Sequence, residues 1–179
     1  MRIVFELEPE DVARFRQAME RAARAAACAE DCDIIDAARQ ALDELPIASA
    51  PGFVRRQLCQ VQRLIAMLED EAWALPAEDR REVLQALAYF SDPEDLIPDH
   101  IEVIGLLDDA IMLALLMRRL DPMLSAYGEF CEFRRGLLAS GPGPEPRLQR
   151  ARALAAQREA LLARMRAEAA ALAATPDLS

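Results

Sequence analysis

The chain has 179 residues, of which 31 are acidic and 21 basic, and its formal net charge is −10. Every basic residue is Arg, only six residues are Gly, and 53% of the chain is hydrophobic. These values exclude a collagen-like chain, a disulfide scaffold and a wholly disordered chain. The low Gly content and the many Ala residues favour helices, and a chain of this length can bury a core without disulfide or metal staples.

The sequence also indicates a compartment. Residues 1–6 lack the charged region and the long apolar stretch of a secretory leader, so we expect a cytoplasmic protein. The longest uninterrupted apolar run, Ala110–Met117, has eight residues, whereas a membrane span needs about 20. We expect the four cysteines to be reduced and buried as small hydrophobic side chains. They are Cys28, Cys32, Cys59 and Cys131.

The N-terminal part predicts a short strand followed by two helices. Ile3, Phe5 and Leu7 alternate with other residues, as in a strand. Because a lone strand needs a partner, we expect an arm that pairs with a second copy in a homodimer. From residue 9 to 26 the apolar residues recur every three or four positions, and the same spacing covers 33–45.

The middle of the chain predicts two more helices, over 54–72 and 77–90, separated at Pro76. The next one, over 106–120, should be buried on every side, because its central residues are apolar all round.

A further helix is expected to start at Asp121-Pro122 and to continue to Leu138. A Gly/Pro linker over 141–146 then leads to a long Ala- and Arg-rich helix over 147–175. From residue 141 onward six Arg face four acidic residues, which leaves 15 Arg against 27 acidic residues before it. This basic tail has two expected partners, the acidic body of its own chain or another copy.

The sequence thus predicts an all-α bundle of about six helices. A helical domain over 1–140 contains a central apolar hairpin at about 80–120, the linker 141–146 follows, and the long C-terminal helix over 147–175 completes the chain. The aromatic residues fall on helical faces and should pack in the core. Those are Trp73, Phe90, Tyr127, Phe130 and Phe133.

The most specific motif of the chain lies between residues 89 and 110. A tyrosine precedes P-x-D-L-I-P-D, and I-G-x-x-D-D-A follows. The motif residues are Tyr89, Pro93, Asp95, Leu96, Ile97, Pro98, Asp99, Ile104, Gly105, Asp108, Asp109 and Ala110. This order resembles the YkvA-like family, a bacterial helical domain family of unknown function. The resemblance implies a compact helical hairpin and carries no activity with it.

Four carboxylates of the motif, those of Asp95, Asp99, Asp108 and Asp109, have two interpretations. As metal ligands they would suit a hard divalent cation such as Mg²⁺ or Ca²⁺. As structural groups they would cap helix starts or pair with Arg side chains. The structural interpretation is preferred, so we expect no cofactor.

The structural interpretation names further residues. Asp92 would be the N-cap of a helix that starts at Pro93, and Arg80 and Arg81 would be the cationic partners of Asp108 and Asp109 if their helices run antiparallel.

No nucleophile triad, phosphate-binding loop or Cys/His pair is present in the sequence, so an enzyme is not favoured. The acidic body disfavours nucleic acid. We therefore expect a non-enzymatic interaction or scaffold module that forms a homodimer or binds a protein partner, with peripheral association at the inner membrane as one form of it. The alternative is a divalent-metal-binding protein or metal-dependent hydrolase that uses the four Asp residues.

Overall fold

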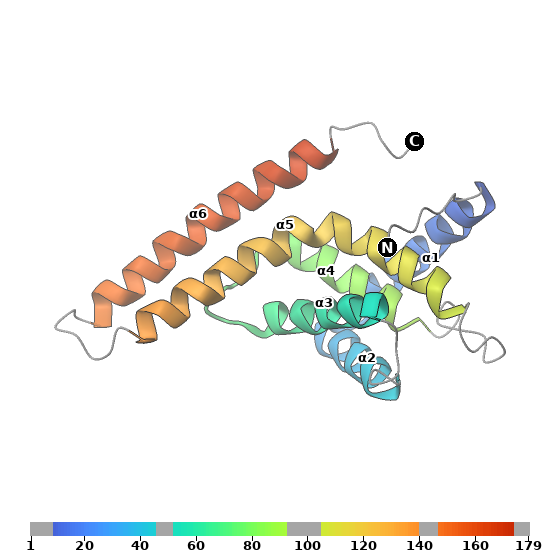
Figure 1. The fold of residues 1–179 in the computed structure, drawn as a ribbon, viewed down its shortest axis with the longest axis horizontal. Helices are drawn as coiled ribbons and strands as arrows, with labels where there is room; N and C mark the ends of the chain where they lie inside the picture. The colour runs from blue at the N-terminus through green and yellow to red at the C-terminus, as the bar shows by residue number, and fades with distance from the viewer. Residues whose placement is uncertain (1–8, 46–51, 93–104, 140–146, 174–179) are drawn as a thin grey trace.

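Six helices make up the parts of the chain that the computed structural model describes, residues 9–45, 52–92, 105–139 and 147–173 (Figure 1). No strand occurs in these ranges, so the predicted all-α bundle is confirmed. The predicted strand arm (residues 1–8) and the linker (141–146) lie outside them. The helices are α1 (Pro9–Cys28), α2 (Asp31–Glu44), α3 (Gly52–Glu69), α4 (Ala77–Phe90), α5 (Gly105–Ala139) and α6 (Arg147–Ala173).

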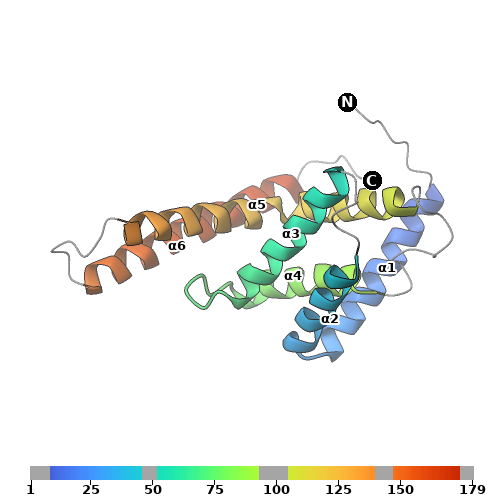
Figure 2. The same ribbon diagram turned by 60° about the horizontal axis from the view of Figure 1, so that its bottom comes forward.

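Helix α4 lies at the centre of the body, in contact with α1, α2, α3 and α5 (Figure 2). Its buried residues cover most of the helix surface and leave a narrow side less buried. They include Val83, Leu87 and Phe90. Tyr89 packs its ring edge-on against Phe15 of α1, with 5.7 Å between the ring centroids. The first residue of the motif over residues 89–110 therefore helps to join α1 to α4.

Side-chain hydrogen bonds connect α2, α3 and α4. Arg80 at the start of α4 donates to Asp31 Oδ2 of α2 at 2.6 Å and to the Leu68 carbonyl of α3 at 2.8 Å. Arg39 of α2 pairs with Glu69 at the end of α3. These hydrogen bonds and ion pairs satisfy polar groups near the ends of the three helices, while the apolar faces of the same helices form the core.

Helix α3 ends at Glu69, three residues before the predicted end, because Asp70 forms a turn. The backbone N–H groups of Trp73 and Ala74 donate to the Asp70 carbonyl, each at 3.0 Å. Ala74 has a φ of 46°, a left-handed conformation that costs energy for a residue with a side chain. Trp73 is therefore placed in a turn and not on a helix, although it is fully buried as expected.

The predicted helix boundary at Asp121-Pro122 is wrong. Helix α5 runs from Gly105 to Ala139 with Pro122 inside it, and Figure 1 shows that it changes direction along its length. Proline lacks an N–H group and its ring crowds the carbonyl four residues earlier, so an interior proline bends a helix without always ending it. Tertiary packing keeps the helix continuous here, since Pro122, Met123 and Leu124 are all buried.

The structure describes the burial of residues 113–120 of the predicted helix 106–120, and in this part the predicted burial on every side holds for one face only. Leu113, Leu116 and Met117 are buried, whereas Ala114 and Leu115 are half-buried. Arg118 and Arg119 are exposed, so the remaining sides of residues 113–120 are less covered than the predicted central helix requires.

Helices α5 and α6 form a long hairpin, and its far end projects beyond the other helices in both ribbon views (Figures 1 and 2). Leu161 and Met165 of α6 are buried in the same core as α5. Two ion pairs add to this packing, from Arg164 to Glu129 of α5 and from Arg166 to Asp79 of α4. The basic C-terminal helix thus packs on its own acidic body.

The cysteine prediction is wrong for three of the four residues. Cys28, Cys32 and Cys59 are exposed and Cys131 is half-buried, and all four are free thiols. Only Cys131 packs against the core.

Candidate functional site

The structure places only part of the motif over residues 89–110. Pro93 to Ile104, which include Asp95 and Asp99, lie outside the described residues. Gly105 is the first residue of α5, and Asp108 and Asp109 follow it within the first two turns. The metal interpretation of the four Asp residues is therefore a prediction still to be tested. In the ranges that the structure does describe, no group of three or more His, Cys, Asp or Glu side chains could hold a metal ion.

Two residues assigned to capping and pairing have the following contacts with other described residues. Asp92 lies just after α4 and pairs with Arg21 of α1 at 3.4 Å. Arg80 pairs with Asp31 of α2 and Arg81 is exposed, whereas the side chains of Asp108 and Asp109, their predicted partners, lie outside the described residues. Arg80 faces α2 because α4 lies between α2 and α5 in the body.

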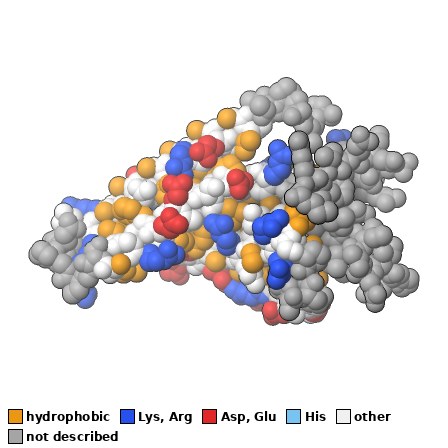
Figure 3. Space-filling model, viewed as in Figure 1, with side chains coloured by type: hydrophobic (Ala, Val, Ile, Leu, Met, Phe, Trp, Pro, Cys, Tyr) orange, Lys and Arg blue, Asp and Glu red, His pale blue; other side chains and the backbone are white. Residues whose placement is uncertain are grey.

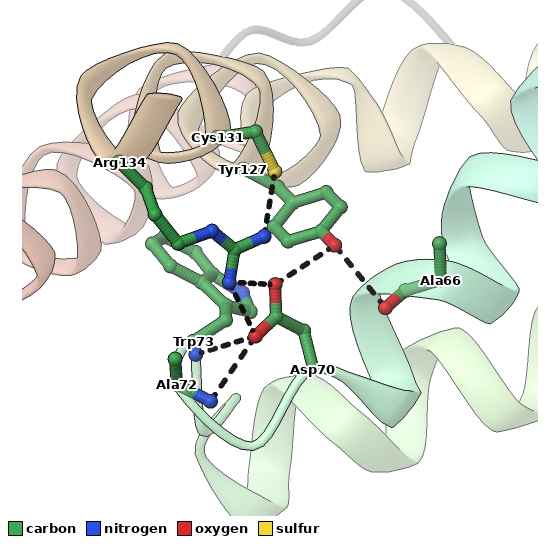
Figure 4. A network of polar contacts seen from close by, with 7 residues as sticks. All are labelled: Ala66, Asp70, Ala72, Trp73, Tyr127, Cys131 and Arg134. Carbon is green, nitrogen blue, oxygen red and sulfur yellow. Dashed lines mark hydrogen bonds and ion pairs between the residues drawn. The ribbon is translucent and has the colours of Figure 1, made fainter. Parts of the chain in front are cut away.

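A polar network that the sequence analysis did not predict is centred on Asp70, in the turn after α3 (Figure 4). Its Oδ1 accepts the backbone N–H groups of Ala72 and Trp73, at 3.1 and 3.3 Å. Nη1 of Arg134 lies 2.8 Å from Oδ2 and 2.9 Å from Oδ1. The hydroxyl of Tyr127 lies 3.1 Å from Oδ2. One carboxylate therefore joins the α3–α4 turn to α5.

The electrostatics of this network favour a structural role. Burial, together with the nearby Cys131 and Asp70, raises the pKa of the Tyr127 hydroxyl above its ordinary value, so this group stays neutral and is a poor nucleophile. Burial opposes the charge of Arg134, but the hydrogen bond and the charge of Asp70 outweigh it and raise the pKa of the guanidinium. The Arg134 guanidinium also lies 5.3 Å from the ring centroid of Phe130. The network fixes a turn and contains no group prepared for catalysis.

The projecting end of the hairpin carries the most exposed large apolar side chains among the described residues. Leu138 near the end of α5 is 72% exposed, and Leu148 near the start of α6 is 61% exposed. Arg135, Arg147 and Arg152, which lie within four positions of these leucines in the sequence, are also exposed. We call residues 131–139 and 147–158 the hairpin tip. Figure 3 shows basic and hydrophobic side chains next to each other at this end of the molecule.

Charge is strongly divided between the tip and the rest of the chain. Residues 131–158 contain six Arg and two acidic residues, a net charge of +4. The remaining 15 Arg and 29 acidic residues give −14. A basic, apolar tip on an acidic body is a surface that could bind an anionic partner.

The sequence contains part of the signal for the Asp70 network and for the hairpin tip. Tyr127, Cys131 and Arg134 recur at i, i+4 and i+7, which places them on one face of a helix. Nothing in the spacing names Asp70 as their partner, because that contact joins residues 57 and 64 positions apart. The tip depends on α6 folding back along α5, which composition alone left open.

Comparison with known proteins adds one result. Residues 81–115 match a family described as "Protein of unknown function (DUF1232)". No curated protein and no solved structure matches the chain. None of the described helices combines the length and the apolar character needed to cross a membrane. The chain therefore contains, from most of α4 to the first part of α5, a segment similar to a helical domain family whose function is unknown.

Proposed function

We propose that the protein is a non-enzymatic helical interaction module that docks through its hairpin tip onto an anionic membrane surface. The observation that carries the proposal is that two exposed leucines, Leu138 and Leu148, lie close in sequence to exposed Arg residues at the end of a projecting hairpin. We further propose that the segment 81–115 is YkvA-like, because the whole motif from Tyr89 to Ala110 falls within it.

The expected binding free energy of the hairpin tip is that of a reversible membrane contact. A basic residue near an anionic membrane surface contributes about 1 kcal/mol, so the three exposed tip arginines contribute about 3 kcal/mol. Transfer of two exposed leucines into the interface adds up to about 4 kcal/mol. A total of about 7 kcal/mol corresponds to a Kd on the order of 10 µM.

The charge division also sets the orientation. The acidic body is repelled by the same surface that attracts the tip, and repulsion falls off over about 8 Å at physiological salt. Because the tip projects beyond the other helices, it can reach the headgroups while the body stays farther away (Figure 2).

Vesicle co-sedimentation tests the proposal. The full chain should bind phosphatidylcholine vesicles that contain phosphatidylglycerol, and pure phosphatidylcholine vesicles much less. The double variant Leu138→Ser/Leu148→Ser and the double variant Arg135→Gln/Arg152→Gln should each bind at least tenfold more weakly.

Matched controls exist on the same chain. Leu172→Ser removes another exposed leucine, and Arg55→Gln removes an exposed arginine of α3, and neither should change vesicle binding. Equal binding by all variants would contradict the proposal. So would light scattering that shows a dimer which the leucine variants dissociate, because a second copy would then be the occupant of the tip.

A further inference from the structure

A pair of exposed cysteines, far in sequence from the hairpin tip, flanks the corner between α1 and α2. Cys28 is the last residue of α1, and Cys32 is the second residue of α2. Both are free thiols on exposed residues, and neither belongs to the hydrophobic core. Packing therefore does not explain a thiol at either position, whereas both side chains are open to reagents in solution.

The corner itself is very short. The Ala29 N–H still donates within the last turn of α1, at 3.0 Å, and the Glu30 carbonyl already accepts the Asp33 N–H of α2, at 3.1 Å. Glu30 is extended, with φ −73° and ψ 147°. The chain therefore changes direction at Glu30, two positions after Cys28 and two positions before Cys32 (Figure 2).

Both cysteines lie on the outer side of this corner. Cys28 follows the buried Ala22 by six positions, and Cys32 precedes the buried Ile34 by two. At about 100° per residue, the cysteines are about 240° and 200° around their helices from those core residues. Helices α1 and α2 pack on the same helix, α4. The corner therefore presents both cysteines on the side away from α4.

We infer that Cys28 and Cys32 form a reversible disulfide, which makes the corner a redox-sensitive clasp between α1 and α2. A disulfide needs a Cα separation of about 4–7 Å. Because the chain turns at Glu30, the positions two before and two after it are brought toward each other over this short span.

The oxidant is a small-molecule disulfide. The thiolate of one cysteine attacks a sulfur of this disulfide and releases one small thiol, which leaves a mixed disulfide on the protein. The thiolate of the other cysteine then attacks the protein sulfur of the mixed disulfide and releases the second small thiol. The protein loses two hydrogen atoms and gains one S–S bond, while the small disulfide is reduced to two thiols.

The charges at the corner favour one class of reagent. Glu30 and Asp33 are exposed beside the cysteines, and Oδ1 of Asp33 lies 3.8 Å from the Cys32 sulfur. A cationic disulfide should therefore approach more readily than an anionic one. The new bond would join α1 directly to α2, so that local opening of the corner becomes less favourable in the oxidised protein.

Equilibration of the full chain with cystamine, a cationic disulfide, tests the inference. Trypsin cleaves after Arg24 and Arg39 and at no position between them, so one peptide contains both cysteines. After the remaining thiols are alkylated, mass spectrometry should find this peptide unalkylated and lighter by two hydrogen atoms. Hydrogen exchange of the Ala29 and Asp33 amides should be at least tenfold slower in the oxidised chain than in the reduced chain.

Serine variants supply the controls. Cys59→Ser removes another exposed cysteine, on α3, and should leave the bond unchanged. Cys28→Ser and Cys32→Ser should each retain a cysteamine adduct on the remaining cysteine of the pair. The same adduct on both cysteines of the wild type, a dimer linked between chains, or no reaction at either cysteine would overturn the inference. Equal amide exchange in the oxidised and reduced chains would overturn the clasp.

Discussion

The short side chain of Asp70 accepts several hydrogen bonds, because it contacts both the turn after α3 and helix α5. Its side chain is 10% exposed, and that of Arg134 is 33% exposed. The carboxylate satisfies two backbone N–H groups that follow α3 and also receives Arg134. The conformation of the turn and the docking of α5 therefore depend on the same group.

Asp70→Asn should lower the free energy of unfolding by about 2 kcal/mol, because it leaves Arg134 half-buried without a counter-charge. Urea unfolding measures the loss. Asp36→Asn is the control: its ion pair with Arg39 is exposed, and the change should be within about 0.5 kcal/mol. Similar losses in both variants would contradict a special role for Asp70.

Tyr127→Phe should cost about 1 kcal/mol, because the hydroxyl shares its single proton between Asp70 Oδ2 and the Ala66 carbonyl. It should also change the response to alkali. The pKa of Tyr127 is higher in the folded than in the unfolded chain, so its contribution is complete below about pH 10 and is lost as the pH rises above that value. Urea unfolding at neutral and alkaline pH should show a smaller alkaline loss in the variant than in the wild type. An unchanged loss would assign the effect to another group.

At the scale of single residues, helical spacing predicts which side chains share a face but not what they meet. The predicted core positions of Trp73, Phe90, Tyr127 and Phe130 are confirmed, whereas Phe133 is only half-buried. Asp70, in contrast, follows a helix and reads as an ordinary polar turn residue until its distant partners are known.

Among the elements, the boundaries of α4 were predicted most accurately. Helix α4 begins and ends where its pattern does, since Pro76 precedes it and Glu78 and Asp79 suit its first turn. Pro122 misled the prediction for α5. An Asp-Pro pair is typical of a helix start. It is tolerated inside a helix when buried contacts on both sides of the proline outweigh the lost backbone hydrogen bond.

The attachment of α6 to the body can be tested through Glu129 and Arg164. The hydrogen bond from Arg164 lowers the pKa of Glu129 below its ordinary value, so the pair stabilises the fold above the unfolded pKa of about 4.3 and loses this effect as the pH falls through the folded pKa. A double-mutant cycle with Glu129→Gln and Arg164→Gln should give a small coupling energy at neutral pH, which vanishes in acid. A coupling that persists in acid would mean that another contact, not the charge of Glu129, joins the helices.

For the whole molecule, the helical class and the contrast between an acidic body and a basic tail could be read from composition. The sequence could not decide whether the tail packs on its own chain, because Ala-rich helices fit several partners equally well. The structure resolves this through Leu161 and Met165, which enter the core of the body.

Whether the Asp residues of the motif bind a divalent cation can be tested on the stability of the whole chain. We expect the melting temperature of the wild type to be unaffected by a chelator, with Asp108→Asn and Asp109→Asn less stable than the wild type in its absence and equally insensitive to it. Thermal unfolding with and without EDTA measures this. A chelator-sensitive wild type with insensitive variants would establish a cation site, since a ligand at 100 times its Kd adds about 2.7 kcal/mol.

The two halves of helix α5 have different neighbours, and we expect them to unfold locally with different free energies. Its first half packs on α3 and α4, whereas its far end has α6 as its neighbour in the projecting hairpin (Figures 1 and 2). Amide protons near Leu138 and Leu148 should therefore exchange with solvent through local fraying of the hairpin, long before those near Leu120 and Leu124, which need the whole body to unfold. One uninterrupted helix would then contain two units of cooperativity, with the boundary near Pro122.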